Sequence, residues 1–279
     1  MSRFEALDKK YSAQVKAGEM SKKDYLKWRK SAMATGKRWE DLRDVLAKDL
    51  SHTNEIATAM INQHAVDCYA LNMNYGTYEI ENGAMINTSF SMYDHATVEN
   101  LMKKNPQIIP KARMDIPRDQ RWNRQKLTSA ITQGILTGDS IPKIAKRLSK
   151  VADMNAVSAL RNARTYTTAA ENKGRVDSYY RAQDMGIEME QEWMSTPDGR
   201  TRDSHVDLDG ERVAVGHTFS NGCRYPGDPM GDPSEVYNCR CTLVAVLKKH
   251  NYNDSDRFTR LPEHMTYSDW KRGHHGRKD

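Results

Sequence analysis

The pattern of apolar and polar positions divides the chain into a long helical part and a shorter part of strands and turns. No glycine or proline interrupts residues 37–75. Large apolar residues recur there at helical spacing, which predicts one long helix or two abutting helices. These residues are Trp39, Leu42, Leu46 and Leu50. After them, β-branched and aromatic residues within 75–91 surround Asn82-Gly83, a pattern that predicts a β-hairpin.

Three further helical segments are expected in the middle of the chain. An apolar stripe at every fourth residue runs through 127–135 and ends at Gly138. Residues 140–148 begin with Ser-Ile-Pro, a typical helix start, and carry an apolar face at i, i+3, i+4 and i+7. A third helix is expected over 155–186. Three prolines in the basic segment 103–117 mark the expected domain boundary.

From Trp193 onward, short apolar runs alternate with Gly, Pro, Asn and Asp, which predicts short strands joined by turns. The fold class expected is α+β, with elongated, mainly helical N-terminal and middle parts and a small β-rich C-terminal domain. A mean hydropathy of -0.84 is low for a compact enzyme and indicates an extended molecule or one that completes its burial against partners. The expected regions are 1–115 (helices and hairpin), 116–192 (basic helices), 193–247 (β-rich) and 248–279 (flexible basic tail).

Charge is distributed unevenly along the chain, whose formal net charge is +6. Residues 51–102 contain no Lys or Arg and six acidic residues, whereas residues 103–150 contain twelve Lys or Arg and three acidic residues. One explanation of this pattern is chance combined with burial of residues 51–102. The other is that the acidic and basic blocks face different partners, and that the partner of the basic block is a polyanion such as DNA. No apolar run is long enough to span a bilayer and no signal-peptide core is present, so a soluble protein made in a cytoplasm is expected.

The densest group of motifs lies in residues 193–246. It comprises DGRTRDSH (198–205), LDG (208–210), YPGDP (225–229) and NCRC (238–241). Upstream lie GILTGDSIPKIAKRL (134–148) and RNARTYTTAAENKGRVDSYYRAQDMGI (161–187). Motifs of this kind in this order resemble the C-terminal domain of the phage Mu F-like minor head proteins, also called the phage head morphogenesis family. The N-terminal part, including YALNMNYGTYEIENG (69–83), is similar to minor head proteins of phages of Gram-positive hosts.

The resemblance implies a non-enzymatic minor capsid protein of a tailed phage, assembled in the host cytoplasm and incorporated into the virion at low copy. It further implies association with the portal protein and other head proteins at the portal vertex. The implied role is in procapsid assembly, and it extends to genome delivery.

One group of residues has metal-ligand chemistry. Three thiolates and one imidazole are a common structural zinc set, and a closed set of four leaves no open position for catalysis. Cysteines two apart on a strand project from the same face. The spacing fits no standard zinc finger, His217 competes for the histidine position, and the cysteines also suit apolar packing or an oxidised pair. The expected ligands of one structural zinc ion are His205, Cys223, Cys239 and Cys241.

The contrasting function is a metal-dependent nucleic-acid-processing enzyme. Three aspartates surround His205 within residues 203–209, but nothing supplies the second histidine or the oriented nucleophile that such a site requires. Loops dense in Asp are more often turns. ADP-ribosyl transfer, which is fused to some relatives of this family, is disfavoured because Glu188-Met189-Glu190 precedes Ser195-Thr196, the reverse of the order that this chemistry uses.

Basic residues cluster on the helices expected in 113–150, with Trp122 among them. Helix-borne Arg and Lys with an interleaved aromatic suit sequence-independent contacts to the backbone of double-stranded DNA. A solvated helix face gives the same pattern. The expected DNA-binding residues are Arg121, Arg124, Lys143, Lys146 and Arg147.

Overall fold

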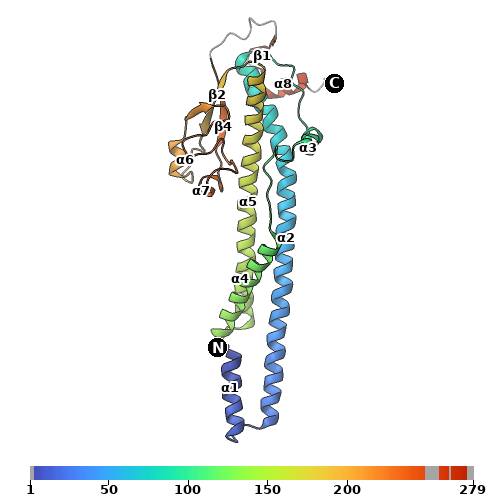
Figure 1. The fold of residues 1–279 in the computed structure, drawn as a ribbon, viewed down its shortest axis with the longest axis vertical. Helices are drawn as coiled ribbons and strands as arrows, with labels where there is room; N and C mark the ends of the chain where they lie inside the picture. The colour runs from blue at the N-terminus through green and yellow to red at the C-terminus, as the bar shows by residue number, and fades with distance from the viewer. Residues whose placement is uncertain (1–2, 249–257, 264, 275–279) are drawn as a thin grey trace. The chain divides into compact units, whose positions relative to one another are not determined.

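The structure of the chain is a computed structural model that describes residues 3–248, 258–263 and 265–274. Helices dominate the N-terminal and middle parts, and small antiparallel sheets lie toward the C-terminus, as the α+β prediction requires (Figure 1). The long helices are α1 (Arg3–Lys16), α2 (Lys22–Ala84), α3 (His95–Lys104), α4 (Ile116–Leu136) and α5 (Ile141–Asp184). The shorter ones are α6 (Asp203–Asp207), α7 (Pro233–Val236) and α8 (Tyr267–His274).

The chain forms two compact units, each built from two separate segments. Unit 1 comprises Met1–Ala57 and Met114–Ser158, and unit 2 comprises Thr58–Arg113 and Ala159–Asp279. Helices α2 and α5 each contribute to both units. No described helix is both long and apolar enough to cross a membrane.

Unit 1 has a small apolar core with a buried polar network beside it. Ala47, Leu127 and Val151 form the core. The side-chain amide of Asn123, which is fully buried, donates to Ser51 Oγ at 3.0 Å and accepts from Asn155 Nδ2 at 3.0 Å. Because a buried amide without partners costs about 1–3 kcal/mol, this network favours one register of α2, α4 and α5 within the unit.

Unit 2 brings the second halves of α2 and α5 into close contact. A Cβ atom on Gly174 would lie 2.5 Å from the carbonyl oxygen of Tyr69, so only glycine allows this approach. Tyr69 Oη donates to Asp177 at 2.6 Å, and Arg175 forms an ion pair with Glu79 at 2.7 Å. These contacts make the helix pair the scaffold of the unit.

A three-stranded antiparallel sheet in the order β3-β2-β4 packs on this scaffold (Figure 1). The strands are β2 (Met189–Met194), β3 (Arg212–Ala214) and β4 (Thr242–Leu247). Gln191 pairs with Val213 on one side and with Ala245 on the other. Trp193 and Leu243 point into a core shared with Val176 and Tyr179 of α5.

The hairpin predicted around Asn82-Gly83 is wrong, because α2 continues to Ala84. Thr77, Ile80 and Ala84 lie at helical spacing and are all buried, so tertiary packing outweighs the β-propensity of this segment. Only β1 (Ile86–Asn87) is a strand, and it pairs with the distant β5 (Thr259–Arg260).

Two other expectations need correction. The helices predicted over 140–148 and 155–186 are one helix, α5, because no Gly or Pro lies between Pro142 and Gly174. The tail predicted to be flexible includes α8, whose Trp270 is 1% exposed and donates through Nε1 to the buried Glu81 at 2.6 Å. Few apolar residues occur there, but one large ring is enough to anchor the segment. Residues 249–257, 264 and 275–279 of the tail lie outside the described residues.

Candidate metal centre

A row of buried polar side chains on α5 holds the segment 238–243 in place. Thr165 Oγ1 accepts a hydrogen bond from the backbone amide of Asn238 at 3.1 Å. One turn further, Thr168 Oγ1 donates to the carbonyl of Cys239 at 2.8 Å. Both threonines are less than 8% exposed, so the bonds are made in a region without solvent competition.

Asn172 completes this row on the next turn of α5. Its Nδ2 donates to the carbonyl of Cys241 at 3.2 Å, and its Oδ1 accepts from the amide of Leu243 at 3.1 Å. The same Nδ2 donates to the carbonyl of Pro226 at 3.2 Å. One side chain therefore joins the YPGDP and NCRC motifs.

The YPGDP loop is fixed by a close approach and by an ion pair. Gly227 has φ +81°, and a Cβ atom there would lie 2.9 Å from the amide nitrogen of Ala169. Asp228 is 1% exposed and accepts two hydrogen bonds from the Arg224 guanidinium at 2.7 and 2.8 Å. Burial alone would raise the pKa of Asp228, but these bonds and two backbone amides lower it overall, so the carboxylate stays charged.

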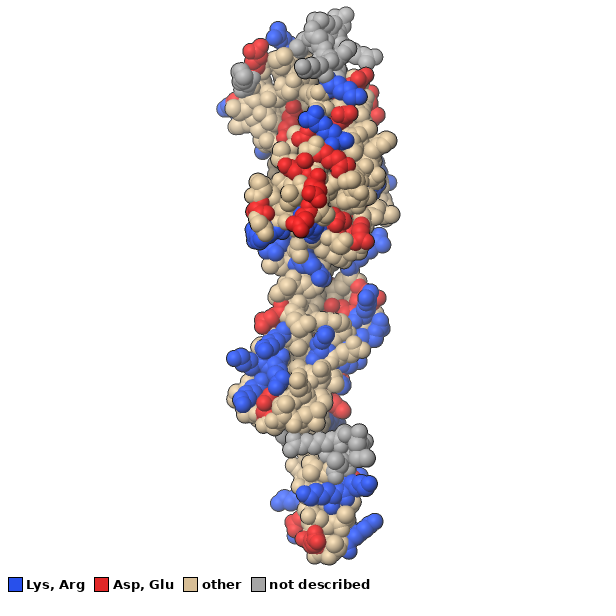
Figure 2. Space-filling view, turned by 90° about the vertical axis from the view of Figure 1, so that its left-hand side faces the viewer, with Lys and Arg blue, Asp and Glu red and all other residues tan. Residues whose placement is uncertain are grey.

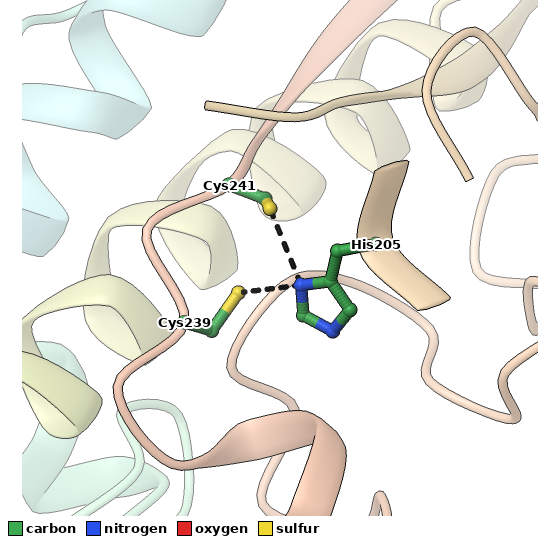
Figure 3. Close-up of side chains that lie close together, drawn as sticks. All are labelled: His205, Cys239 and Cys241. Atoms are coloured by element: carbon green, nitrogen blue, oxygen red, sulfur yellow. Dashed lines mark hydrogen bonds between the residues drawn. The ribbon is translucent and has the colours of Figure 1, made fainter. Parts of the chain in front are cut away.

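With the segment in place, His205, Cys239 and Cys241 come together (Figure 3). All three are buried, and their ligand atoms lie within 4.8 Å of one another. His205 Nδ1 is 3.7 Å from Cys239 Sγ and 3.3 Å from Cys241 Sγ. Tetrahedral zinc with ordinary Zn–N and Zn–S bonds separates N and S ligands by about 3.5 Å. The three side chains therefore fit a tetrahedral metal ion and can hold one.

Glu235 sets the orientation of the His205 ring from the side that faces away from the two cysteines. Nε2 of that ring lies 3.0 Å from Glu235 Oε2, an ion-pair distance without hydrogen-bond alignment. Ser204 Oγ and Asn221 Nδ2 donate to the same carboxylate at 3.1 and 3.3 Å. A carboxylate behind a ligating histidine is a common arrangement at metal centres, where it fixes the ring. Glu235 was not predicted from the sequence.

The pKa values of the Cys239 and Cys241 thiols are shifted in opposite directions. The hydrogen bond between them, with a further one from His205, lowers the pKa of Cys241. The same thiol–thiol bond, together with burial, raises the pKa of Cys239. Cys241 is therefore the side chain that more easily supplies the thiolate on which metal binding depends.

Two residues considered for the metal site lie outside this group. Cys223 is 1% exposed, and its Sγ faces Gly231, where a Cβ atom would lie 2.4 Å away. Burial and the nearby Asp228 raise its pKa to about 11, which keeps it a neutral thiol. His217 is exposed and is not part of the group. The structure thus brings together three of the four predicted ligands.

The Asp/His loop does not form a second cluster. Asp203 and Asp207 are exposed, and Asp209 accepts a hydrogen bond from the amide of Ser195 at 2.7 Å. Within the described residues, the metal-ligand group that contains His205 has two cysteines and no aspartate. These acidic side chains act locally as turn and helix-end residues.

The predicted DNA-binding residues all lie in unit 1, on α4 and α5. Arg121, Lys143 and Lys146 are exposed. Arg124 forms an ion pair with Asp44 at 3.0 Å, and Arg147 with Asp139 at 2.7 Å. On the face that Figure 2 shows, Lys and Arg side chains form one group and Asp and Glu side chains form another. No nucleic acid contact follows from this arrangement alone, so DNA binding stays a prediction.

Comparison with known proteins agrees with the motif order. Residues 125–244 match the family described as "Phage Mu protein F like protein". Minor head protein GP7 of Bacillus phage SPP1 is 23% identical over 280 residues, which cover 95% of this chain and 86% of that protein. No solved structure matches significantly.

Two other relatives share only part of their length with the chain. The NAD(+)--arginine ADP-ribosyltransferase EFV of Enterococcus faecalis is 29% identical over 205 residues, 69% of this chain and 40% of that protein. The uncharacterized protein YqbB of Bacillus subtilis is 29% identical over 124 residues, 42% of this chain and 40% of that protein. The chain thus spans less than half the length of these two. The matched residues and their motifs thus make residues 125–244 similar to the phage Mu protein F-like family, and the chain as a whole similar to a minor head protein.

Proposed function

We propose that the chain is a minor head protein that acts at the portal vertex during procapsid assembly and stays in the virion for genome delivery. The observation that carries this proposal is the similarity to GP7, which extends over 95% of the chain and includes both units. The partners proposed are the portal protein and other head proteins. Two exposed apolar side chains on one side of α2 support such docking, because Met60 and Leu71 are 65% and 56% exposed and lie three helical turns apart.

We also propose that the chain is not an enzyme. The matched region is 40% of the ADP-ribosyltransferase, so more than half of that protein has no counterpart here. The Glu188-Met189-Glu190 segment lies on the opposite side of Ser195-Thr196 from the order that the chemistry uses. Purified protein is expected to release no nicotinamide from NAD+ in the presence of an arginine acceptor. Release above that of a heat-treated sample would contradict this.

The metal proposed for the cluster is one zinc ion with a stabilising role. Zinc suits a mixed set of imidazole and thiolate ligands. The ligands lie outside the strands β2, β3 and β4, which have at most six residues each, so a metal ion would cross-link segments that few ladder hydrogen bonds hold. Zinc would be held by His205 Nδ1 and the two thiolates, with Glu235 behind the ring.

Protein purified without a histidine tag is expected to contain about one zinc ion per chain. Cys239→Ala should lose the zinc and lower the melting temperature of unit 2, because structural zinc contributes on the order of 10 kcal/mol to folding. Cys223→Ala is the matched control and should keep the zinc, since its Sγ lies outside the group. Metal analysis and calorimetry with and without a chelator measure both effects. A metal-free wild-type protein that melts identically with chelator would contradict the zinc proposal.

Replacing Met60 and Leu71 by Asp should reduce incorporation of the chain into procapsids about tenfold or more. Charged side chains at the centre of an apolar interface cost on the order of 2 kcal/mol or more. Leu136→Asp is the control, since Leu136 is equally exposed, at 65%, but lies on α4. Quantitative immunoblots of purified procapsids give the readout, with circular dichroism to verify folding. Full incorporation of the double variant would rule out this face of α2 as the docking site.

Weak, sequence-independent binding of double-stranded DNA is expected through unit 1. Its affinity should fall with salt with a slope of about -0.9 per phosphate neutralised. Changing the exposed Arg121, Lys143 and Lys146 to Gln should remove most of the binding. The control carries the same charge change in unit 2, at Arg212, Arg260 and Lys271. Fluorescence anisotropy that shows no salt dependence, or equal losses in the two triple variants, would exclude a DNA-binding face on unit 1.

A further inference from the structure

The metal centre has three protein ligands, one fewer than the four of a tetrahedral zinc ion. A cavity of about 20 Å³ is lined by His205, Cys239 and Cys241 themselves. A metal ion held by these three side chains would occupy this space, so a fourth ligand would approach it from the side of the other lining residues. A metal with three protein ligands and one open position takes an exchangeable fourth ligand.

The remaining walls of the cavity are rich in positive charge. They are formed by Arg200, Thr201, Arg202, Asn238 and Arg240. Asp198 neutralises one of the three arginines, because it accepts two hydrogen bonds from Arg240 at 2.5 and 2.7 Å. A divalent ion with two thiolates and a neutral imidazole adds no net charge. The Glu235 carboxylate, 3.0 Å from His205, offsets a second arginine. The surroundings of the fourth position therefore carry about one positive charge, which favours an anion.

Arg202 provides a second, independent sign of a missing ligand. Its Nη2 donates to the carbonyl of Tyr237 at 2.6 Å, whereas its Nη1 is buried and has no hydrogen-bond partner. Leaving a buried donor of a charged group without an acceptor is more costly than leaving a neutral one unsatisfied. An acceptor oxygen in the cavity lined by Arg202 would satisfy it.

The nearby side chains do not supply an ordinary fourth ligand. Ser195 Oγ lies 3.9 Å from Cys241 Sγ, but a serine hydroxyl is not among the usual zinc ligands. Cys223 is buried beside Gly231 and is not part of the group of three ligands. Glu235 faces Nε2 of His205, the nitrogen on the far side of the ring from the thiols.

We propose that the fourth ligand is an exchangeable oxygen of a small phosphate-type oxyanion, held by Arg202 and by the arginines at the cavity. Guanidinium groups match the oxygens of such anions and bind them with charge-assisted hydrogen bonds. The proposal rests on the zinc proposal for the same three ligands. The sequence led us to expect four protein ligands. The proposed centre has three protein ligands and one bound anion instead.

The test uses the full-length protein loaded with Co²⁺, whose visible d–d bands report the ligands of a zinc site. Inorganic phosphate is titrated at constant ionic strength. A saturable change in the d–d bands is expected, with no loss of bound cobalt. Arg202→Gln should weaken phosphate binding about tenfold or more, and Arg200→Gln, whose side chain is 82% exposed and has little part in folding, should weaken it less. Arg212→Gln, at a distance from the cavity wall on β3, should leave it unchanged.

The outcomes separate this proposal from the one on which it rests. If cobalt binds with one ion per chain but phosphate leaves its bands unchanged, the fourth position is closed and the oxyanion proposal is wrong. If Cys223→Ala alters the thiolate-to-cobalt charge-transfer band, Cys223 is the fourth ligand and the proposal is again wrong. If the wild-type protein binds no cobalt or zinc, the metal proposal itself fails.

Discussion

The side-chain amide of Asn172 is the interaction on which the C-terminal part of the structure depends. It is 1% exposed and forms hydrogen bonds to the backbone on both sides of Cys241 and to the YPGDP loop. A buried amide that lost these partners would cost about 1–3 kcal/mol. The position of β4, and with it the spacing of the two cysteine ligands, follows from this contact.

The metal cluster is a consequence of that arrangement. Helix α5 fixes Cys239 and Cys241 from one side, and α6 supplies His205 from the other, with Glu235 setting the ring. The apolar core beneath the sheet is shared with the long helices, so the sheet is not an independent domain. In a minor head protein, a site of this kind would tie the conformation of the C-terminal part to the presence of a metal ion and its anion.

The sequence predicts the parts of this molecule that depend on local patterns. The long helix in α2, the end of α4 near Gly138 and the change to strands after Trp193 follow from spacing and turn residues. The hairpin fails because burial of Ile80 in a helix outweighs β-propensity. Three of the four predicted ligands meet, but Cys223 does not, because residue type cannot tell a ligand from a core thiol. The buried polar row on α5 leaves only a weak signal in the sequence, namely Thr165, Thr168 and Asn172 at helical spacing.

The measurement that most directly tests the role of α5 is backbone hydrogen exchange in wild type and Asn172→Ala. The amides of Asn238 and Leu243 donate to Thr165 and Asn172 of α5. The account predicts that the Leu243 amide exchanges about 10–100 times faster in the variant, which matches a loss of about 1–3 kcal/mol. Amides in the buried network of unit 1 should keep their protection. Equal protection of Leu243 in both proteins would contradict the claim that this side chain holds the metal-binding segment in place.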